Sequence, residues 1–231
     1  ILYAGTADGA YKTSNSGASW TPTALAAGDV TDLVTDNEGV AKRIWVTVSG
    51  QGVAYSSDGG TSFQVFSAGL ASLEVTSIDL EDIGVAKRIW VTMAGGDGIA
   101  YSDDLGQTWS GGAGNGLTDR QLNDVAIDGT AKRIWVTGDN GVFSSDDAGL
   151  SWADRSVGLP GRVSVTSVAL EPHTGEPLVS LFSGEDGGVY RGGGLRAAWA
   201  PFNDGLGELR VRRLTHDGGR EVTPGSFETT F

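Results

Sequence analysis

Short runs of alternating apolar and polar residues follow one another along the chain. Residues 75–80 (VTSIDL) alternate with a period of two, which is typical of a β-strand with two different faces. Residues 88–93 (RIWVTM) are rich in β-branched and aromatic side chains, which favour strands. Residues 99–102 and 108–110 complete a set of four short strands joined by a loop and Gly-rich turns. Because no window of eleven or more residues has a helical period, the sequence predicts an all-β protein.

This four-stranded unit repeats along the whole chain with a period near 45 residues. The nonapeptide at 39–47 (GVAKRIWVT) recurs at 84–92 and, with one change, at 129–137, so both steps are 45 residues. A second, independent series is one aromatic residue per unit, at steps of 43, 46, 43 and 47 residues: Trp20, Phe63, Trp109, Trp152 and Trp199. The two series give the same period.

Four short strands in each 45-residue unit predict a single β-propeller of about five four-stranded blades. Residues 2–6 match the second strand of the unit and residues 209–215 match the first, so we expect this C-terminal strand to close the ring on the N-terminal blade. The tail 218–231 then either caps the closure or begins another blade. The expected repeats are 1–29, 30–74, 75–120, 121–162 and 163–208, followed by the closing strand and tail, 209–231.

The turn between the third and fourth strands carries the pattern Ser/Thr-x-Asp/Asn-x-Gly-x-Ser/Thr-aromatic in four of the units. The fifth unit, from Tyr190 to Trp199, keeps its aromatic residues and loses the pattern. The pattern residues are Thr13, Asn15, Gly17 and Trp20; Ser56, Asp58, Gly60 and Phe63; Ser102, Asp104, Gly106 and Trp109; and Ser145, Asp147, Gly149 and Trp152.

This turn resembles the Asp box, or BNR repeat, of sialidases, sortilin-type receptor domains, xyloglucanase-type glycosidases and photosystem II assembly factors. The resemblance implies a propeller, and it implies no single activity because those families do unrelated things. A short Asp or Asn side chain accepts hydrogen bonds from the backbone of its own turn, and Gly adopts the conformation that follows. We therefore expect Asp58, Asp104 and Asp147 to stabilise turns rather than to catalyse or bind metal.

The position of the third-strand aromatic residue shifts between units. Tyr11, Phe143 and Tyr190 precede the aligned aromatic residue by nine positions, whereas Tyr55 and Tyr101 precede it by eight. A shift of one residue turns a strand side chain to the opposite face of its sheet. We expect these two tyrosines to face the other way, either buried between blades or exposed as a contact patch.

Charged residues differ between the two sets of turns. The first-to-second turns carry the Lys-Arg pairs 42–43, 87–88 and 132–133, which predict a basic collar on the Asp-box face. The second-to-third turns should form an acidic channel mouth on the opposite face. Such a mouth consists either of solvated turns or of oxygen ligands for a cation, Ca²⁺ above all, or for a glycan. The candidate residues are Asp8, Asp97, Asp139, Glu185 and Asp186.

Composition and motifs argue against several functions. A net charge of −13 disfavours nucleic acid or an anionic membrane as the partner, and no apolar run is long enough to insert into a bilayer. The chain has no cysteine, and His173 and His216 are isolated from each other. A sialidase requires an Arg-Ile-Pro motif, which is absent. No carboxylate pair stands out for glycoside hydrolysis, although 29 acidic residues keep that reaction open.

The sequence therefore favours a non-catalytic propeller scaffold that recognises a protein or a glycan and needs no cofactor. The family resemblance implies a secreted, periplasmic or extracellular setting. One alternative is a glycoside hydrolase propeller, or a fragment of one, that uses channel carboxylates. Another is an assembly or accessory subunit of a larger complex.

Overall fold

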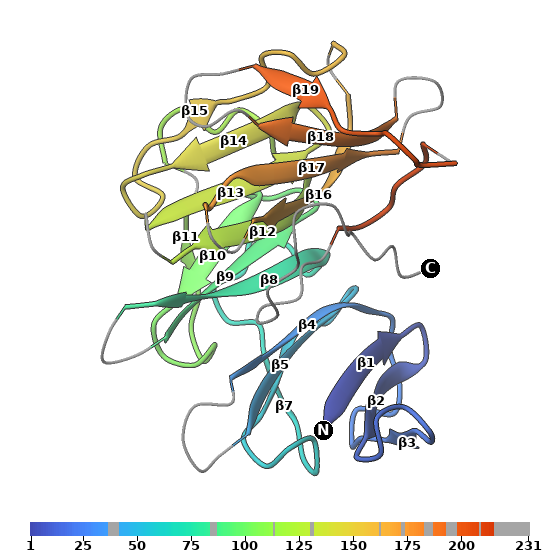
Figure 1. The fold of residues 1–231 in the computed structure, drawn as a ribbon. Coiled ribbons are helices and arrows are strands. Elements are labelled where there is room, and N and C mark those ends of the chain that lie inside the picture. Colours follow the sequence, from blue (N-terminus) through green and yellow to red (C-terminus); the bar gives the residue numbers. More distant parts are fainter. Residues whose placement is uncertain are drawn as a thin grey trace.

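Figure 1 shows the chain, in a computed structural model, as a succession of antiparallel β-sheets in sequence order. One sheet has three strands and four sheets have four, and the described residues contain no helix. The all-β propeller prediction is confirmed. The structure describes residues 1–36, 42–83, 87–112, 114–129, 132–161, 163–171, 174–182, 187–192, 198–207 and 209–214.

Each sheet falls within one of the predicted repeats, and its strands follow each other in chain order. We call the sheets blades one to five. The strands are β1 (Leu2–Thr6), β2 (Gly9–Thr13) and β3 (Thr21–Pro22) in blade one; β4 (Val30–Asp36), β5 (Arg43–Val48), β6 (Gly52–Ser56) and β7 (Gln64–Phe66) in blade two; β8 (Val75–Asp82), β9 (Lys87–Met93), β10 (Ile99–Ser102) and β11 (Ser110–Gly111) in blade three; β12 (Leu122–Asp128), β13 (Arg133–Gly138), β14 (Gly141–Ser145) and β15 (Ala153–Asp154) in blade four; and β16 (Val165–Leu170), β17 (Pro177–Leu181), β18 (Gly188–Gly192) and β19 (Trp199–Pro201) in blade five.

The cores lie between successive blades. Trp45 of β5 is buried in one cluster with Val91 and Ala100 of blade three, and Trp90 of β9 is buried with Val136 and Phe143 of blade four. Side chains of a strand alternate between its two faces, so each blade presents one apolar set to the blade before it and another to the blade after it.

The one-residue shift of the third-strand aromatic does turn the side chain over. Tyr55 pairs with Trp45 and its ring lies 5.2 Å from the indole, on the face toward blade three. Tyr101 lies in the same way 5.1 Å from Trp90. In contrast, Phe143 packs back onto blade three. The prediction from spacing is confirmed, and both tyrosines are half-buried between blades.

The aligned aromatic residue of blades three to five fastens each blade to the preceding one. The indole N–H of Trp109 donates to the carbonyl of Phe66 at 3.2 Å, that of Trp152 to Gly112 at 3.0 Å, and that of Trp199 to Arg155 at 2.5 Å. A buried indole N–H requires such a partner. The carbonyl acceptors all lie at or beside the outer strand of the preceding blade.

The N-terminal blade lacks the fourth strand that the sequence predicts. Residues 209–214 are not a strand in the part of the chain that the structure describes, and β1 pairs with β2 alone. These residues instead follow the inner strand of blade five, where Thr166 Oγ1 donates to the carbonyl of Val211 and the amide of Leu214 donates to Ser167 Oγ. Closure of the ring by strand pairing stays a prediction.

The glycines of the Asp-box turns allow a direct test of packing between blades. Gly17 and Gly149 both have left-handed backbones, with φ of 90° and 84°. A Cβ on Gly149 would lie 2.9 Å from the Trp90 ring of the preceding blade, whereas a Cβ on Gly17 would meet nothing within 4 Å.

We predict that Gly17→Ala loses about 1 kcal/mol of unfolding free energy through backbone strain alone. Gly149→Ala should lose a further amount of about 1–3 kcal/mol, because the added methyl group overpacks the interface. Urea unfolding at fixed pH measures both. Equal losses for the two variants would show that the turn does not pack against Trp90 as described.

Candidate functional site

The inner strands of successive blades are joined by one recurring side-chain bond near their first residues. Thr31 Oγ1 donates to the carbonyl of Val75 at 2.7 Å, and Thr76 Oγ1 donates to that of Leu122 at 2.9 Å. Asn123 contacts Val165 and Thr166 contacts Val211 in the same way. The series makes Val211 the equivalent of the residue that begins each inner strand.

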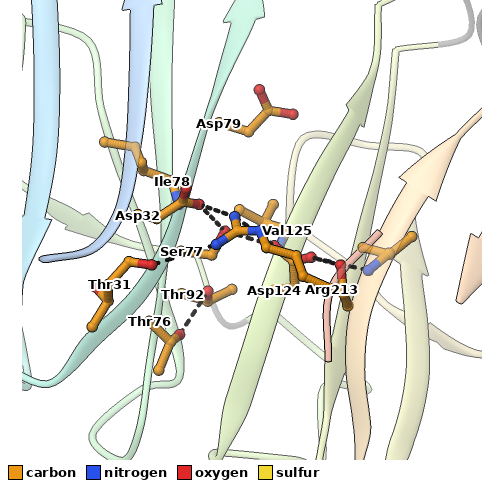
Figure 2. A network of polar contacts seen from close by, with 12 residues as sticks. Thr31, Asp32, Thr76, Ser77, Ile78, Asp79, Thr92, Asp124, Val125 and Arg213 are labelled. Carbon is orange, nitrogen blue, oxygen red and sulfur yellow. Dashed lines mark hydrogen bonds and ion pairs between the residues drawn. The ribbon is translucent and has the colours of Figure 1, made fainter. Parts of the chain in front are cut away.

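Two residues further along each inner strand, five equivalent side chains meet in a polar ring, which we call the inner ring. Its members come from β4, β8, β12 and β16, one from each of blades two to five, and from the segment 209–214. Figure 2 shows most of this network. The members are Asp32, Ser77, Asp124, Ser167 and Arg213.

Hydrogen bonds join Asp32, Ser77, Asp124 and Ser167 in turn. Ser77 Oγ lies 2.7 Å from Asp32 Oδ2 and 2.6 Å from Asp124 Oδ1, and Ser167 Oγ lies 2.6 Å from Asp124 Oδ2. Arg213 Nη2 completes the series with an ion pair to Asp32 Oδ2 at 2.5 Å. Both serines and Asp124 are buried.

The charges of the inner ring are unbalanced, because two carboxylates face one guanidinium group. Burial raises the pKa of Asp124, although the charge of Arg213 and the hydrogen bonds from Ser167, Ser77 and Val168 oppose this shift. Burial acts to lower the pKa of Arg213, but the charges of Asp32 and Asp124 outweigh it and raise that pKa. The arginine therefore stays charged, whereas burial favours the neutral form of Asp124.

A cavity of about 330 Å³ opens beside the inner ring, bounded by inner-strand residues 32–34, 77–79, 124–127 and 168–170 together with 213–214. Apolar residues such as Val34, Ile127 and Leu170 line it together with the polar residues of the inner ring. Its volume is at the lower end of the range found for small-molecule pockets, which begins near 300 Å³.

Asp79 is the carboxyl group of this cavity that lies outside the inner ring, and Figure 2 shows it turned away from the network. It accepts hydrogen bonds from the amides of Leu80 and Ile127, both at 2.8 Å. Burial raises its pKa to about 7, because it outweighs these two hydrogen bonds and is reinforced by the charges of Asp124 and Asp32. A carboxyl group with this pKa can accept or donate a proton near neutrality.

The Asp-box residues lie in the turns that the sequence indicates and are bonded within them. In blade two, Asp58 Oδ1 accepts from the amides of Thr61 and Ser62, and Oδ2 accepts from Ser62 Oγ. Ser56 Oγ donates to Asp58 and accepts from the amide of Gly60. The side-chain and backbone bonds from Ser62 are the main reason that the pKa of Asp58 falls to about 2. The carboxylate is occupied by its own turn.

The Asp boxes of blades one, three and four share this pattern. Thr13 Oγ1 donates to Asn15, Ser102 Oγ to Asp104 and Ser145 Oγ to Asp147. The pKa values of Asp104 and Asp147 are lowered too, with hydrogen bonds from Thr108 and Ser151 opposing burial.

The acidic channel mouth stays a prediction. Asp8, Asp97 and Asp139 are exposed on separate turns, and no group of three acidic or histidine side chains is placed to hold a metal ion among the described residues. Asp139 accepts from Ser164 Oγ at 2.7 Å. Glu185 and Asp186 lie outside the described residues.

The predicted basic collar is largely neutralised by local carboxylates. Arg88 forms a bidentate ion pair with Asp103, at 2.7 and 2.9 Å. Arg133 pairs with Asp146, and Lys87 pairs with Asp82. Sequence reasoning treated each Lys-Arg pair alone and missed the acidic residue inside the next Asp box. His173 and His216 lie outside the described residues.

The two end blades each keep a face that no other described sheet covers. Trp109, Trp152 and Trp199 are 5–6% exposed, whereas the equivalent Trp20 of blade one is 41% exposed. Leu2 is 55% exposed. It pairs with the first residue of its Asp box, and the residues that do so in blades two to four are buried isoleucines: Ile44, Ile89 and Ile134. We call this the blade-one face, and it consists of Leu2, Ala4, Tyr11 and Trp20.

Blade five presents a different, charged surface at its free face. In blade five, Arg191 pairs with Leu178. The equivalent pairs are Tyr55 with Trp45 in blade two and Tyr101 with Trp90 in blade three. The guanidinium group of Arg191 forms an ion pair with Glu176 at 2.7 Å and lies over the ring of Phe202. A hollow of about 430 Å³ adjoins these three side chains.

Comparisons of this structure with solved structures identify the fold as a β-propeller. The chain is similar to an ancestral GH74 enzyme, with 21% identity, a TM-score of 0.69 and coverage of 90% of this chain and 30% of the other. An extracellular domain of a one-component system from B. thetaiotaomicron is 14% identical, with a TM-score of 0.69 and coverage of 94% of this chain and 29% of the other. YCF48 bound to a D1 peptide is 11% identical, with a TM-score of 0.58 and coverage of 86% of this chain and 63% of the other.

The chain thus spans about a third of the GH74 protein and of the B. thetaiotaomicron protein. At these identities the likeness shows the fold alone. No protein-family model and no curated protein sequence matches the chain. Among the described residues, no helix has the length and apolar character needed to cross a membrane.

The raised pKa of Asp79 predicts a pH dependence. A carboxyl group whose pKa is higher in the folded state adds stability at low pH and loses it as the pH rises through the folded value. We expect wild-type stability to fall between about pH 4 and about pH 7–8.

In Asp79→Asn the fall should be smaller, because the amide does not ionise. The variant loses one of the two backbone hydrogen bonds, so it should be less stable than wild type at pH 4 and relatively better at pH 8. Thermal unfolding across this range measures the crossover. Parallel curves for the two proteins would place the pKa of Asp79 outside the range.

Proposed function

We propose that the protein is a non-catalytic propeller scaffold that binds a protein partner on the blade-one face. The observation that carries this proposal is the exposure of Trp20 and Leu2. The tryptophans equivalent to Trp20 in blades three to five are buried, and so are the isoleucines equivalent to Leu2 in blades two to four. Large exposed apolar groups that lie together on one surface are typical of an interaction site.

The interfaces inside the molecule indicate the chemistry of the partner. Between blades two and three, and between blades three and four, the equivalent of the blade-one face is covered by an aromatic pair, Trp45 with Tyr55 or Trp90 with Tyr101. We infer that the partner presents a flat β-sheet surface with aromatic or branched aliphatic side chains.

Blade five does not offer such a surface to blade one. Covering Trp20 with blade five would bury the Arg191–Glu176 ion pair, and desolvation of two charges costs several kcal/mol for each ion. Association of the charged face of blade five with the aromatic blade-one face is therefore unfavourable. This supports another protein, rather than blade five, as the occupant of the blade-one face.

The comparisons support recognition in general terms. The YCF48 structure contains a bound peptide, and the B. thetaiotaomicron match is an extracellular domain. We propose an extracytoplasmic setting for this chain as well. A protein-binding propeller of this kind also fits an accessory subunit of a larger assembly.

Glycoside hydrolysis is the second candidate, and the observation in its favour is Asp79 with its pKa of about 7 at a cavity, on a fold shared with GH74 enzymes. Hydrolysis requires two carboxyl groups that flank the scissile bond. The other carboxyl groups at this cavity are Asp32 and Asp124, and both are hydrogen-bonded to Ser77. This arrangement favours the scaffold proposal.

A photoreactive phenylalanine analogue at position 20 should crosslink to one partner protein in an extract of the source organism. The same analogue at position 150 is the matched control, because Leu150 is 74% exposed on an Asp-box turn away from the blade-one face. Trp20→Ser should abolish capture of that partner by a tagged protein, and Leu150→Ser should leave it unchanged.

Both substitutions should change the unfolding free energy much less than the loss of about 3–5 kcal/mol expected for removing a buried tryptophan such as Trp109. Equal crosslinking at positions 20 and 150 would refute the blade-one face as the binding surface. Binding on a glycan array that survives Trp20→Ser would favour a glycan ligand. Release of reducing sugar that Asp79→Asn abolishes would favour the hydrolase.

A further inference from the structure

A single hydroxyl group lies between two carboxyl groups at the centre of the inner ring. Ser77 Oγ is within hydrogen-bonding distance of Asp32 Oδ2, at 2.7 Å, and of Asp124 Oδ1, at 2.6 Å. A serine has one hydroxyl proton and can donate it to one acceptor. If both carboxyl groups were ionised, one of these short contacts would place two lone pairs against each other.

The surroundings decide which carboxyl group carries the missing proton. Arg213 Nη2 and the amide of Ile78 both approach Asp32 Oδ2, the oxygen that faces Ser77, so this oxygen accepts hydrogen bonds and has an arginine beside it. Asp124 is 4.0 Å from the same guanidinium group and is the more deeply buried of the two carboxyl groups. Arg213 thus pairs directly with Asp32, whereas burial favours the neutral form of Asp124.

We propose that the folded propeller holds one proton on Asp124 Oδ1, and that this proton completes a one-way hydrogen-bond chain that binds segment 209–214 to the other inner strands. Asp124 donates to Ser77, Ser77 donates to Asp32, and Asp32 accepts from Arg213. On the other side, the amide of Leu214 donates to Ser167, and Ser167 donates to Asp124 Oδ2. With this assignment every bond has one donor and one acceptor.

The charged groups that face this chain are accounted for strand by strand. Strand β4 contributes Asp32, β8 contributes Asp79, β12 contributes Asp124 and the segment 209–214 contributes Arg213, whereas the described residues of β16 contribute the neutral Ser167. The charges of Asp124 and Asp32 also raise the pKa of Asp79. Loss of the proton from Asp124 leaves more carboxylates than Arg213 can balance, so the structure should loosen as the pH rises through the pKa of Asp124 in the folded protein.

The same substitution at the two carboxyl groups should have opposite consequences. Asp124→Asn keeps a donor toward Ser77 and an acceptor toward Ser167, and it loses only the hydrogen bond from the amide of Val125. Asp32→Asn removes the negative partner of Arg213. Both variants are made in an Asp79→Asn background, so that Asp79 does not contribute to the titration.

In thermal unfolding at pH 7, Asp32→Asn should lower the midpoint at least twice as far as Asp124→Asn does. Between pH 5 and pH 9, the midpoint of the Asp79→Asn parent should fall, and that of the Asp124→Asn variant should fall less. Infrared spectroscopy provides a readout that a purely structural role would not change: the parent should show the absorption of a protonated carboxyl group at pH 7, and Asp124→Asn should remove it.

Two results would overturn the proposal. One is the absence of a protonated-carboxyl band in the Asp79→Asn parent at pH 7. The other is a band that persists in Asp124→Asn and disappears in Asp32→Asn, which would place the proton on the other carboxyl group.

Discussion

The packing of each sheet against the next is the interaction on which this molecule depends. A unit of about 45 residues has an apolar set on both faces of its sheet and cannot bury either face by itself. Trp45 and Trp90 are buried because a following blade covers them, and Trp109, Trp152 and Trp199 because a preceding blade accepts their indole N–H groups. Asp boxes hold the turns that carry Trp109 and Trp152, so the carboxylates of these boxes serve the fold.

This dependence gives the two ends of the array a special character. Blade one retains the apolar positions of an internal blade at Leu2 and Trp20, without a described sheet to cover them. Blade five replaces the aromatic pair with Arg191, Glu176 and Phe202 and so has a free face that water can solvate. The centre of the array is joined by different chemistry, because the inner ring links all five positions through carboxyl, hydroxyl and guanidinium groups.

The 45-residue period was sufficient to predict the strands, the turns and the orientation of Tyr55 and Tyr101, because these features depend on residues close in the sequence. The inner ring was missed, although Asp32, Ser77, Asp124, Ser167 and Arg213 recur at one position of the period. Their residue types differ and alternate with apolar neighbours, so they resemble the solvated side of a strand. The exposure of Trp20 could not be predicted, because the motif is the same whether or not another sheet lies beside it.

The ion pair between Arg213 and Asp32 joins residues 181 positions apart. Neighbouring blades can associate as soon as each is made, since their contacts are about one repeat apart, but this contact requires nearly the whole chain. Contacts between distant residues form slowly, because a long loop must close first. A nascent chain would therefore have its blades stacked while the inner ring still lacked Arg213, leaving Asp32 and Asp124 without this positive partner until residue 213 is made.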